Sequence, residues 1–342
     1  MKAIVYTQYG PPDVLQLKEV SKPEPREDQV LVKVHAASAN ALDYRRFEKL
    51  SPMGRLMEKR MIKSVGRPLG ADVAGVVEAV GVNVKQFKPG DEVFGTSEGS
   101  RGGFAEYTCS GENNLAPKPS NLSFEAAAAV PVAAITALQG LRDKAQIQAG
   151  QKVLIIGASG GVGTYAVQIA KAFGAEVTAV CSARNREMAR SIGADHVIDY
   201  AKEDFTQSGR LYDLIFAVNG FHPLSAYRRA LNPRGVYLCA GGTLPQILQA
   251  MLFGPLMSSK NGKKMRSMGI AKVNQKDLLC MKELLESGKV APVIEKCYPL
   301  REAPAVMQYL AEGHARGKVV LIVDNNYRIQ QGPDQKQPGG DS

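Results

Sequence analysis

The sequence predicts an α/β protein with two parts, a β-rich N-terminal part and a doubly wound parallel sheet. The first 120 residues hold short β-type runs separated by Gly and Pro, with a turn signal about every ten residues, which is typical of a small β-barrel. From residue 153 to about residue 239, apolar strands alternate with segments of helical periodicity. That alternation predicts a parallel sheet covered by helices on both faces.

Local patterns predict the individual elements in order. In the N-terminal part, strands are predicted at 1–6, 29–35, 73–80 and 92–96. Ser123 is expected to cap a helix that begins at Phe124, and a second helix is expected over 133–142. The parallel strands are predicted at 153–156, 176–180, 196–198, 214–217 and 236–239. A helix over 277–287, ended by Gly288, and a strand over 317–323 follow.

The composition is typical of a globular protein in a reducing compartment. Hydrophobic residues make up 44% of the 342 positions and charged residues 22%, which is enough for a sizeable core. No apolar run reaches the roughly 18 residues of a membrane-spanning helix, and the first residues do not resemble a signal peptide. The five cysteines are scattered without a C-x-x-C pair, which indicates free thiols and a cytoplasmic location.

The net charge of +10 leaves several interpretations open. Basic residues gather at 45–67 and at 260–266. They form a solvated face, which is the usual case, or they contact a phosphate-bearing ligand or an anionic membrane surface. The sequence contains no recognisable nucleic-acid-binding module, and no nucleic-acid partner is expected.

A glycine-rich turn within residues 153–170 is the main functional motif. The run VLIIGASGGVGTYAVQIA combines an apolar strand, three glycines three residues apart (Gly157, Gly160 and Gly163) and an amphipathic helix. A second strand at 176–181 completes a βαβ unit. Glycines permit a tight turn close to a pyrophosphate, and the helix N-terminus offers free N–H groups to it. The motif predicts a bound dinucleotide, the alternative being a tight turn without a ligand.

The end of the second strand favours NADP(H) over NAD(H). In this kind of unit an acidic residue about 20 positions after the glycines binds the ribose of NAD, whereas a basic residue accommodates the 2′-phosphate of NADP. Here the strand is followed by Ser182, Arg184 and Arg186, with no carboxylate beside them. A guanidinium can form two charge-assisted bonds with a phosphate. The alternative is that the two arginines begin a solvated helix.

A series of short motifs runs in order along residues 1–323. They are ASANALDY (37–44), LGADVAG (69–75), VGVNVKQFKPGDEV (80–93), GGFAEY (102–107), ITA (135–137), the glycine loop, GADHVIDY (193–200) and GKVVL (317–321). Together they resemble the medium-chain dehydrogenase/reductase superfamily, in its zinc-independent quinone oxidoreductase branch. The resemblance implies a GroES-like β-barrel catalytic domain (1–123), a Rossmann NADP-binding domain (124–265) and a return to the catalytic domain (266–324). The polar, Gly- and Pro-rich residues 325–342 are expected to be a disordered tail.

The sequence departs from the zinc-dependent members of that superfamily at their metal-ligand positions. Asn40 stands where they have a Cys ligand, and Gly70, Ala71 and Asp72 replace their Gly-His-Glu. Only Cys109 corresponds to the four cysteines of their structural zinc lobe. Because catalytic zinc needs about three protein ligands, no metal is expected. The resemblance then implies an enzyme that transfers a hydride from NADPH to a quinone or an α,β-unsaturated carbonyl.

The resemblance also implies roles for single residues. Asn40 and Thr136 are expected near the nicotinamide, and Tyr44 is expected on the substrate side as a proton or hydrogen-bond donor, or else as a packed aromatic. Asp72 is expected to be structural, and Asp43 to orient the backbone or Arg45. The expected cofactor contacts are Ala158, Ser159, Gly160, Gly161 and Val162 for the pyrophosphate, Ser182, Arg184 and Tyr200 for the 2′-phosphate, Asn219 and Gly241 for the nicotinamide side, and Lys318 for the ribose.

Two segments are expected near the mouth of the cofactor cleft. Residues 47–68 include a basic amphipathic helix at 54–64, and residues 244–268 are apolar and then basic. They form a substrate lid or a dimer contact, or they admit a lipophilic acceptor and touch an anionic bilayer. The expected partners are therefore a small lipophilic carbonyl or quinone, a second copy in a homodimer, and, in the last case, a membrane surface.

Two other functions remain open. One is an enoyl-thioester reductase of the same superfamily, although the stretch after Tyr44 lacks the Tyr that donates a proton in that group. The other is a non-enzymatic, membrane-associated NADPH-binding adaptor. The intact set of Asn40, Thr136 and the glycine loop disfavours the adaptor.

Overall fold

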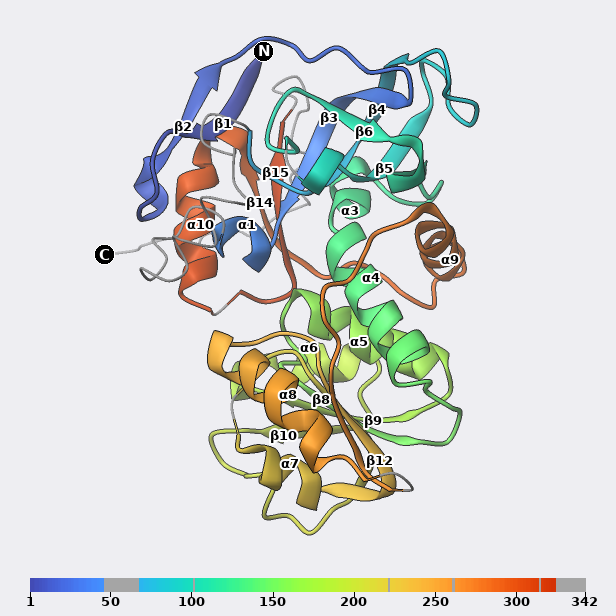
Figure 1. Cartoon of the computed structure of the whole chain (residues 1–342), viewed down its shortest axis with the longest axis vertical. Coiled ribbons are helices and arrows are strands. Elements are labelled where there is room, and N and C mark those ends of the chain that lie inside the picture. The colour runs from blue at the N-terminus through green and yellow to red at the C-terminus, as the bar shows by residue number, and fades with distance from the viewer. Residues whose placement is uncertain (46–67, 101, 221, 260–261, 314, 324–342) are drawn as a thin grey trace, which may run out of the picture.

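The computed structural model describes residues 1–45, 68–100, 102–220, 222–259, 262–313 and 315–323. Figure 1 shows two units, one above the other, that are joined by helices in the middle of the molecule. The predicted helix at 54–64 and the predicted tail at 325–342 lie outside the described residues.

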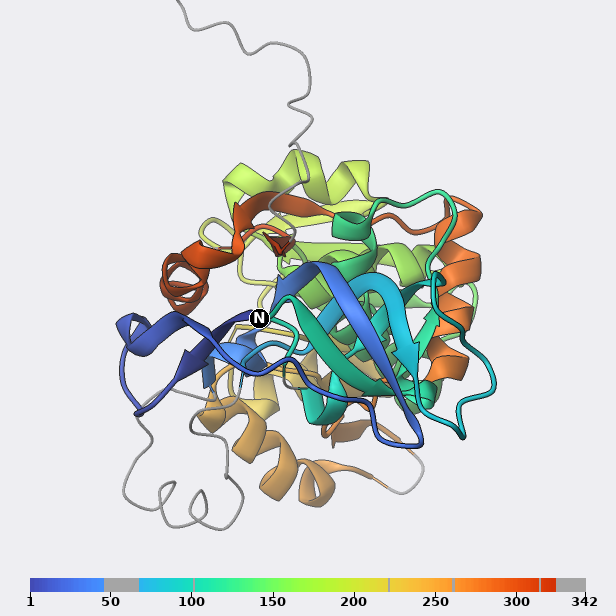
Figure 2. The same ribbon diagram turned by 90° about the horizontal axis from the view of Figure 1, so that it is seen from above.

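The upper unit of Figure 1 contains a seven-stranded sheet. Its strands are β3 (Gln29–Ala39), β4 (Asp72–Val80), β5 (Glu92–Thr96), β6 (Tyr107–Gly111), β7 (Leu115–Pro117), β14 (Ile294–Pro299) and β15 (Lys318–Ile322). They run in the order β14-β15-β3-β4-β5-β7, and β6 pairs with the first half of β3. Seen from above, these strands curl around one another (Figure 2). A separate antiparallel ribbon is formed by β1 (Lys2–Tyr6) and β2 (Leu15–Glu19).

The C-terminal end of the chain completes this sheet. β15 pairs antiparallel with β3, with Val319 opposite Ala39, and β14 pairs parallel with β15. Val319, Val320 and Leu321 are fully buried, and this apolar run, about 280 positions after β3, supplies the strand between β14 and β3. Two helices, α1 (Ala41–Arg45) and α10 (Ala303–Ala311), contact each other on this unit.

The lower unit of Figure 1 is a six-stranded parallel sheet. Its strands are β8 (Lys152–Ile156), β9 (Glu176–Cys181), β10 (His196–Asp199), β11 (Tyr212–Ala217), β12 (Leu231–Cys239) and β13 (Lys264–Ser267). The order β10-β9-β8-β11-β12-β13 is that of the dinucleotide-binding fold, and it reverses between β8 and β11. Strand β13 was not predicted from the sequence. Of its four residues only Met265 is buried, and it lies between the charged Lys264 and Arg266.

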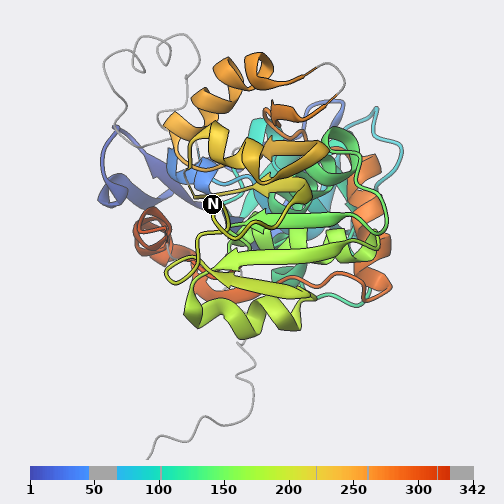
Figure 3. The same cartoon turned by 90° about the horizontal axis from the view of Figure 1, so that it is seen from below.

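Helices cover both faces of the parallel sheet, as the alternating residues of β8 show. Val153 and Ile155 enter a core cluster with α4 (Pro131–Leu138), α5 (Gly161–Ala172), α6 (Arg186–Ser191) and α9 (Gln275–Glu286). Leu154 and Ile156 enter a second cluster with α7 (Leu224–Arg229) and α8 (Leu244–Met257). Figure 3, from below, shows the sheet between α8 on one side and the helices that follow β8 and β9 on the other.

The helices between the two units follow the predicted capping pattern. The Ser123 hydroxyl accepts a hydrogen bond from the Ala126 N–H (3.2 Å) at the start of α3 (Phe124–Ala128). α4 begins at Pro131 and continues as wider turns over Gln139–Lys144. Gly288 follows α9 with φ +71°, as expected for the residue after a helix. Short helical turns lie at Pro12–Val14, Glu98–Ser100, Glu112–Asn114, Ala183–Asn185 and Leu300–Glu302.

All five cysteines are unpaired, and Cys181 and Cys239 are buried as core residues. Among the described residues, no helix is both long enough and apolar enough to cross a bilayer.

Candidate active site

The glycine loop lies where the order of the parallel strands reverses. Gly157 follows β8 with φ +79°, a conformation that residues with a side chain rarely adopt. A Cβ atom on Gly163 would overlap the carbonyl oxygen of Gly157. These two glycines therefore permit the tight turn and the close packing of α5 on it.

Helix α5 begins at this turn without a side-chain hydrogen bond at its N-cap. Its N-cap residue is Gly160, which has no side chain to accept the first N–H groups of the helix, those of Gly161 and Val162 among them. Such groups, together with the helix dipole, favour a phosphate. Ala158 differs from the expectation, because its N–H donates to the Val180 carbonyl (3.1 Å) and its side chain is fully buried. Ala158 closes the turn in this structure.

The residues predicted for the 2′-phosphate meet at the carboxyl ends of β9 and β10. Ser182 and the exposed Arg184 follow β9, and Tyr200 follows β10, with its N–H directed to the Cys181 carbonyl (3.3 Å). The structure also brings Asp199 here, in register with Cys181, which spacing along the sequence did not reveal. The Asp199 side chain is 6% exposed and accepts from the Ala201 N–H (3.1 Å), and burial and then its charge raise the pKa of the Cys181 thiol.

Asn219 and Gly241 lie at the ends of two adjacent strands, β11 and β12. A Cβ atom on Gly157 would approach the Cβ of Asn219 to 3.0 Å, so Asn219 lies directly beside the glycine loop. A Cβ atom on Gly241 would lie 2.8 Å from the Val218 carbonyl oxygen. Both predicted residues therefore line the same end of the sheet as the loop.

The loop is joined to the upper unit through Gly317 and Lys318. The Gly317 N–H donates to the Ser159 carbonyl (2.8 Å), and Gly160 and Gly317 form a parallel bridge. A Cβ atom on Gly161 would lie 3.1 Å from Cδ of Lys318, so the stem of this lysine passes beside the start of α5.

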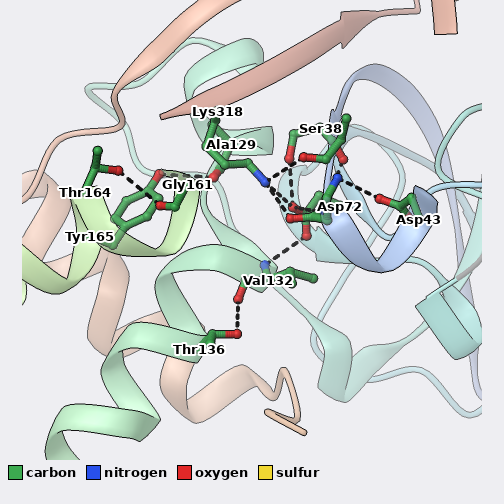
Figure 4. A network of polar contacts seen from close by, with 12 residues as sticks. Ser38, Asp43, Asp72, Ala129, Val132, Thr136, Gly161, Thr164, Tyr165 and Lys318 are labelled. Atoms are coloured by element: carbon green, nitrogen blue, oxygen red, sulfur yellow. Dashed lines mark hydrogen bonds and ion pairs between the residues drawn. The ribbon is translucent and has the colours of Figure 1, made fainter. Parts of the chain in front are cut away.

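A buried polar network lies at the other end of the Lys318 side chain (Figure 4). Its centre is the fully buried carboxylate of Asp72 at the start of β4. Oδ2 of Asp72 accepts from Ser38 Oγ (2.7 Å), Asn40 Nδ2 (2.9 Å) and Lys318 Nζ (3.3 Å), and Oδ1 accepts from the Val132 N–H (2.9 Å). The network thus connects strands of the upper unit to α4.

The Lys318 side chain is 3% exposed, and its ammonium has three acceptors. Besides Asp72, it donates to Asn40 Oδ1 (2.6 Å) and to the Ala39 carbonyl (3.2 Å). Its predicted contact with the cofactor ribose remains a prediction, since in this structure the ammonium is directed at Asn40 and Asp72.

The remaining predicted residues surround this network. The Asn40 N–H donates to Asp43 Oδ2 (2.9 Å), so Asp43 orients the backbone, as expected. Tyr44 is half-buried and packs against an apolar cluster of the upper unit, which agrees with the packing alternative. Thr136 is one turn after Val132 on α4, and its hydroxyl donates to the Val132 carbonyl (2.7 Å). Its predicted place near the nicotinamide remains a prediction.

The sequence did not reveal that Asp72 is the centre of a buried network or that Ser38 belongs to it. Both residues lie in motifs that were recognised, ASANALDY and LGADVAG, but nothing in the sequence shows that the two motifs share one carboxylate. The pairing of β3 with β4, in which Ser38 lies opposite Asp72, brings them together.

Two family models match the chain. An alcohol dehydrogenase GroES-like domain matches residues 26–120, and a zinc-binding dehydrogenase domain matches residues 192–321. Within the described ranges, no group of three or more His, Cys, Asp or Glu side chains is placed to hold a metal ion.

Curated relatives and a solved structure match almost the whole chain. The 2-methylene-furan-3-one reductase of Solanum lycopersicum is 37% identical over 94% of this chain and 79% of the relative. The chloroplastic NADPH-dependent alkenal/one oxidoreductase of Arabidopsis thaliana is 35% identical with the same coverage. The quinone oxidoreductase structure from Coxiella burnetii superposes with a TM-score of 0.83 at 30% identity, over 95% of this chain and 99% of that chain. The chain therefore belongs to the medium-chain dehydrogenase/reductase superfamily of oxidoreductases, in its quinone oxidoreductase-like branch.

Proposed function

We propose that this oxidoreductase reduces a quinone or an α,β-unsaturated carbonyl by hydride transfer from NADPH, without zinc. The observation that carries the proposal is the link between the glycine loop and Asn40. Gly317 is bonded to Ser159 of the loop, and the next residue, Lys318, is bonded to Asn40. The relatives support the substrate class, since their names specify an alkenal or enone, a 2-methylene-furan-3-one and a quinone.

The residues of this chain bind and orient the cofactor and the substrate, and NADPH, when bound, supplies the hydride. The first N–H groups of α5 are suited to the pyrophosphate. The Asn40 carboxamide is held at both ends, because its nitrogen donates to Asp72 and its oxygen accepts from Lys318. A polar group fixed in this way needs no rearrangement during the reaction, which favours the transition state. Tyr44 packs against the apolar cluster of the upper unit but is only half-buried, and its hydroxyl is the proposed hydrogen-bond donor to the substrate carbonyl.

The residues at the expected metal position do not fit zinc. Zinc sites use thiolate, imidazole and carboxylate ligands, whereas Asn40 and Ala71 supply an amide and a methyl group. The Lys318 ammonium already compensates the negative charge of Asp72 at 3.3 Å. Turnover after dialysis against a chelator is therefore expected to equal turnover before it. Activity that is lost on dialysis and restored by zinc would contradict the proposal.

The cofactor preference for NADPH is supported by the basic end of β9. Ser182 and Arg184 are exposed enough to meet a ligand, and the nearby Asp199 carboxylate is engaged with the backbone and nearly buried. The Ser182→Ala/Arg184→Ala variant is expected to raise KM for NADPH about ten- to a hundredfold, which corresponds to the loss of one hydrogen bond to a charged group, worth about 1.5–3 kcal/mol. KM for NADH should change little.

Arg190→Ala is the matched control, since Arg190 is also exposed but lies on α6 and pairs with Glu187. It should leave both KM values unchanged. An equal loss with NADPH and NADH in the Ser182/Arg184 variant would contradict the phosphate assignment.

A substrate panel separates the proposed reaction from its alternatives. NADPH oxidation is measured with a quinone, an alkenal and an enoyl-CoA thioester. Turnover of the quinone or the alkenal is expected. Activity on the thioester alone would identify an enoyl-thioester reductase, and tight NADPH binding without oxidation of any acceptor would identify an adaptor.

The proposal also includes a homodimer in a reducing compartment such as the cytoplasm. The five unpaired cysteines agree with that compartment.

A further inference from the structure

The helices between the two units are interrupted at Pro131. α3 lies against β3 and β4 of the upper unit, whereas α4 lies against α5 of the lower unit. Pro131 has no N–H and begins α4, whose first backbone hydrogen bond runs from the Ala134 N–H to the Val130 carbonyl (2.8 Å). The Ala129 carbonyl and the Val132 N–H therefore lie outside the hydrogen-bond ladders of both helices.

Each of these two backbone groups is bound by a side chain, and the two side chains come from different units. The Ala129 carbonyl accepts from the Tyr165 hydroxyl of α5 (3.1 Å), and the Val132 N–H donates to Asp72 Oδ1 (2.9 Å). Figure 4 shows both contacts, with Tyr165 directed at Ala129. Because a buried backbone group without a partner is costly, the two contacts fix the place of the α3–α4 break between α5 and β4.

The Tyr165 hydroxyl is a donor that does not ionise at neutral pH. The side chain is fully buried. Burial and then the negative charge of Asp72 raise the pKa of Tyr165 well above its usual range. The phenol therefore keeps its proton and its hydrogen bond to Ala129, and it is not placed to exchange a proton with a substrate.

Tyr165 connects the cofactor helix to Asn40. α5 begins at Gly161, four residues before Tyr165, so the helix that would bind the pyrophosphate at its N-terminus also carries this tyrosine. On the other side of the break, Oδ2 of Asp72 accepts from Asn40 Nδ2 (2.9 Å). Three hydrogen bonds, joined by the backbone of residues 129–132, therefore lead from α5 to Asn40.

We propose that Tyr165 is a positioning residue for hydride transfer, which fixes Asn40 relative to the cofactor by holding the α3–α4 break against α5. This role rests on the proposed function, in which Asn40 lies near the nicotinamide. Without the hydroxyl, the Ala129 carbonyl loses its donor and the break is held from the Asp72 side alone. A small displacement of a group that orients the reactants lowers the rate of reaction strongly.

Tyr165→Phe tests the proposal, since it removes only the hydroxyl. Hydride transfer is followed as the loss of NADPH absorbance in a single turnover with a quinone or an alkenal, so that product release does not limit the rate. The rate should fall about tenfold. NADPH affinity in a fluorescence titration should change less than about twofold, because the start of α5 is unaltered. A single-turnover rate within about twofold of the wild type would overturn the proposal.

Tyr212→Phe is the matched control. Tyr212 is also a buried tyrosine of the lower unit, 3% exposed, but it begins β11, at the opposite end of the parallel strands from the glycine loop. Both variants lose a buried hydroxyl and should unfold at lower urea concentrations than the wild type. Only Tyr165→Phe should slow hydride transfer, and equal slowing by both variants would show that a loosened core is the cause and that the proposal is wrong.

A double variant tests whether the effect passes through Asn40. In an Asn40→Ala background, Tyr165→Phe should slow hydride transfer less than about twofold further, because the two changes affect the same group. A further loss of about tenfold would show that Tyr165 acts elsewhere, which contradicts the proposal.

Hydrogen exchange tests the same connection without turnover. NADPH should slow amide exchange at the start of α5 in both the wild type and Tyr165→Phe, but at residues 129–134 only in the wild type. No protection of residues 129–134 in the wild type, or equal protection in both proteins, would overturn the proposal. This measurement needs no acceptor, so a wild type that reduces neither a quinone nor an alkenal would count against the proposed function and not against the role of Tyr165.

Discussion

Replacing Asp72 with asparagine should destabilise the protein strongly, because it leaves the Lys318 ammonium buried without a counter-charge. Asp72 is fully buried and Lys318 is 3% exposed, with 3.3 Å between Oδ2 and Nζ. Removing one partner of a buried ion pair costs about 3–5 kcal/mol. Asparagine also offers one oxygen where the carboxylate has two, so it cannot keep the hydrogen bonds from both Asn40 and Val132. We expect the free energy of unfolding to fall by about 3–5 kcal/mol.

The assay is urea unfolding followed by circular dichroism, since the chain contains no tryptophan. The double variant Asp72→Asn/Lys318→Met should be more stable than Asp72→Asn alone, because it leaves no unpaired charge in the interior. Glu78→Gln is the control for an exposed pair, since Glu78 is 40% exposed and 2.7 Å from Lys22. It should cost less than about 1 kcal/mol. An Asp72→Asn variant as stable as the control, or a double variant less stable than Asp72→Asn, would refute the reasoning.

Two further predictions concern the glycine loop and pH. Gly163→Ala should weaken NADPH binding at least about tenfold in a fluorescence titration, because the new Cβ would overlap the Gly157 carbonyl and displace the turn, and unchanged affinity would contradict this role. Burial opposes ionisation of Asp277, but hydrogen bonds from Gln139 and Arg142 outweigh it and lower the pKa of Asp277. A lowered folded-state pKa stabilises the fold above the unfolded pKa of about 4, and this contribution disappears as the pH falls through the folded value. The stability advantage of the wild type over Asp277→Asn should therefore shrink below about pH 4 in urea unfolding, and a constant difference from pH 7 to 3 would show that the carboxylate charge is not involved.

Most of the elements were predictable because their patterns are local. The alternate residues of each predicted parallel strand reach the two core clusters. Because both faces of these strands are buried, each strand appears in the sequence as an apolar run. Capping by Ser123 depends on residues three positions apart. β13 has only one buried residue, Met265, between two exposed cations, which is why its pattern resembles a basic loop.

The site was predictable in part: the parts formed by adjacent residues were predicted, and the parts formed by residues far apart in the sequence were not. The glycine loop is a continuous segment, so its turn and its helix N-terminus follow from adjacent residues. Asp199 meets Cys181 only through the pairing of β9 with β10, and its carboxylate was not foreseen at that edge.

The α/β class, the parallel sheet, the glycine loop and the superfamily can be recognised from the order of the amino acids, because they depend on periodicity and on contiguous motifs. The buried network of Ser38, Asn40, Asp72 and Lys318 becomes visible only in the folded chain, since up to about 280 residues separate its members in the sequence. The folded structure also shows that Leu252 and Leu256 of α8 are 61% and 80% exposed. An apolar helix is compatible with burial or exposure, and only the neighbouring elements determine which face they cover.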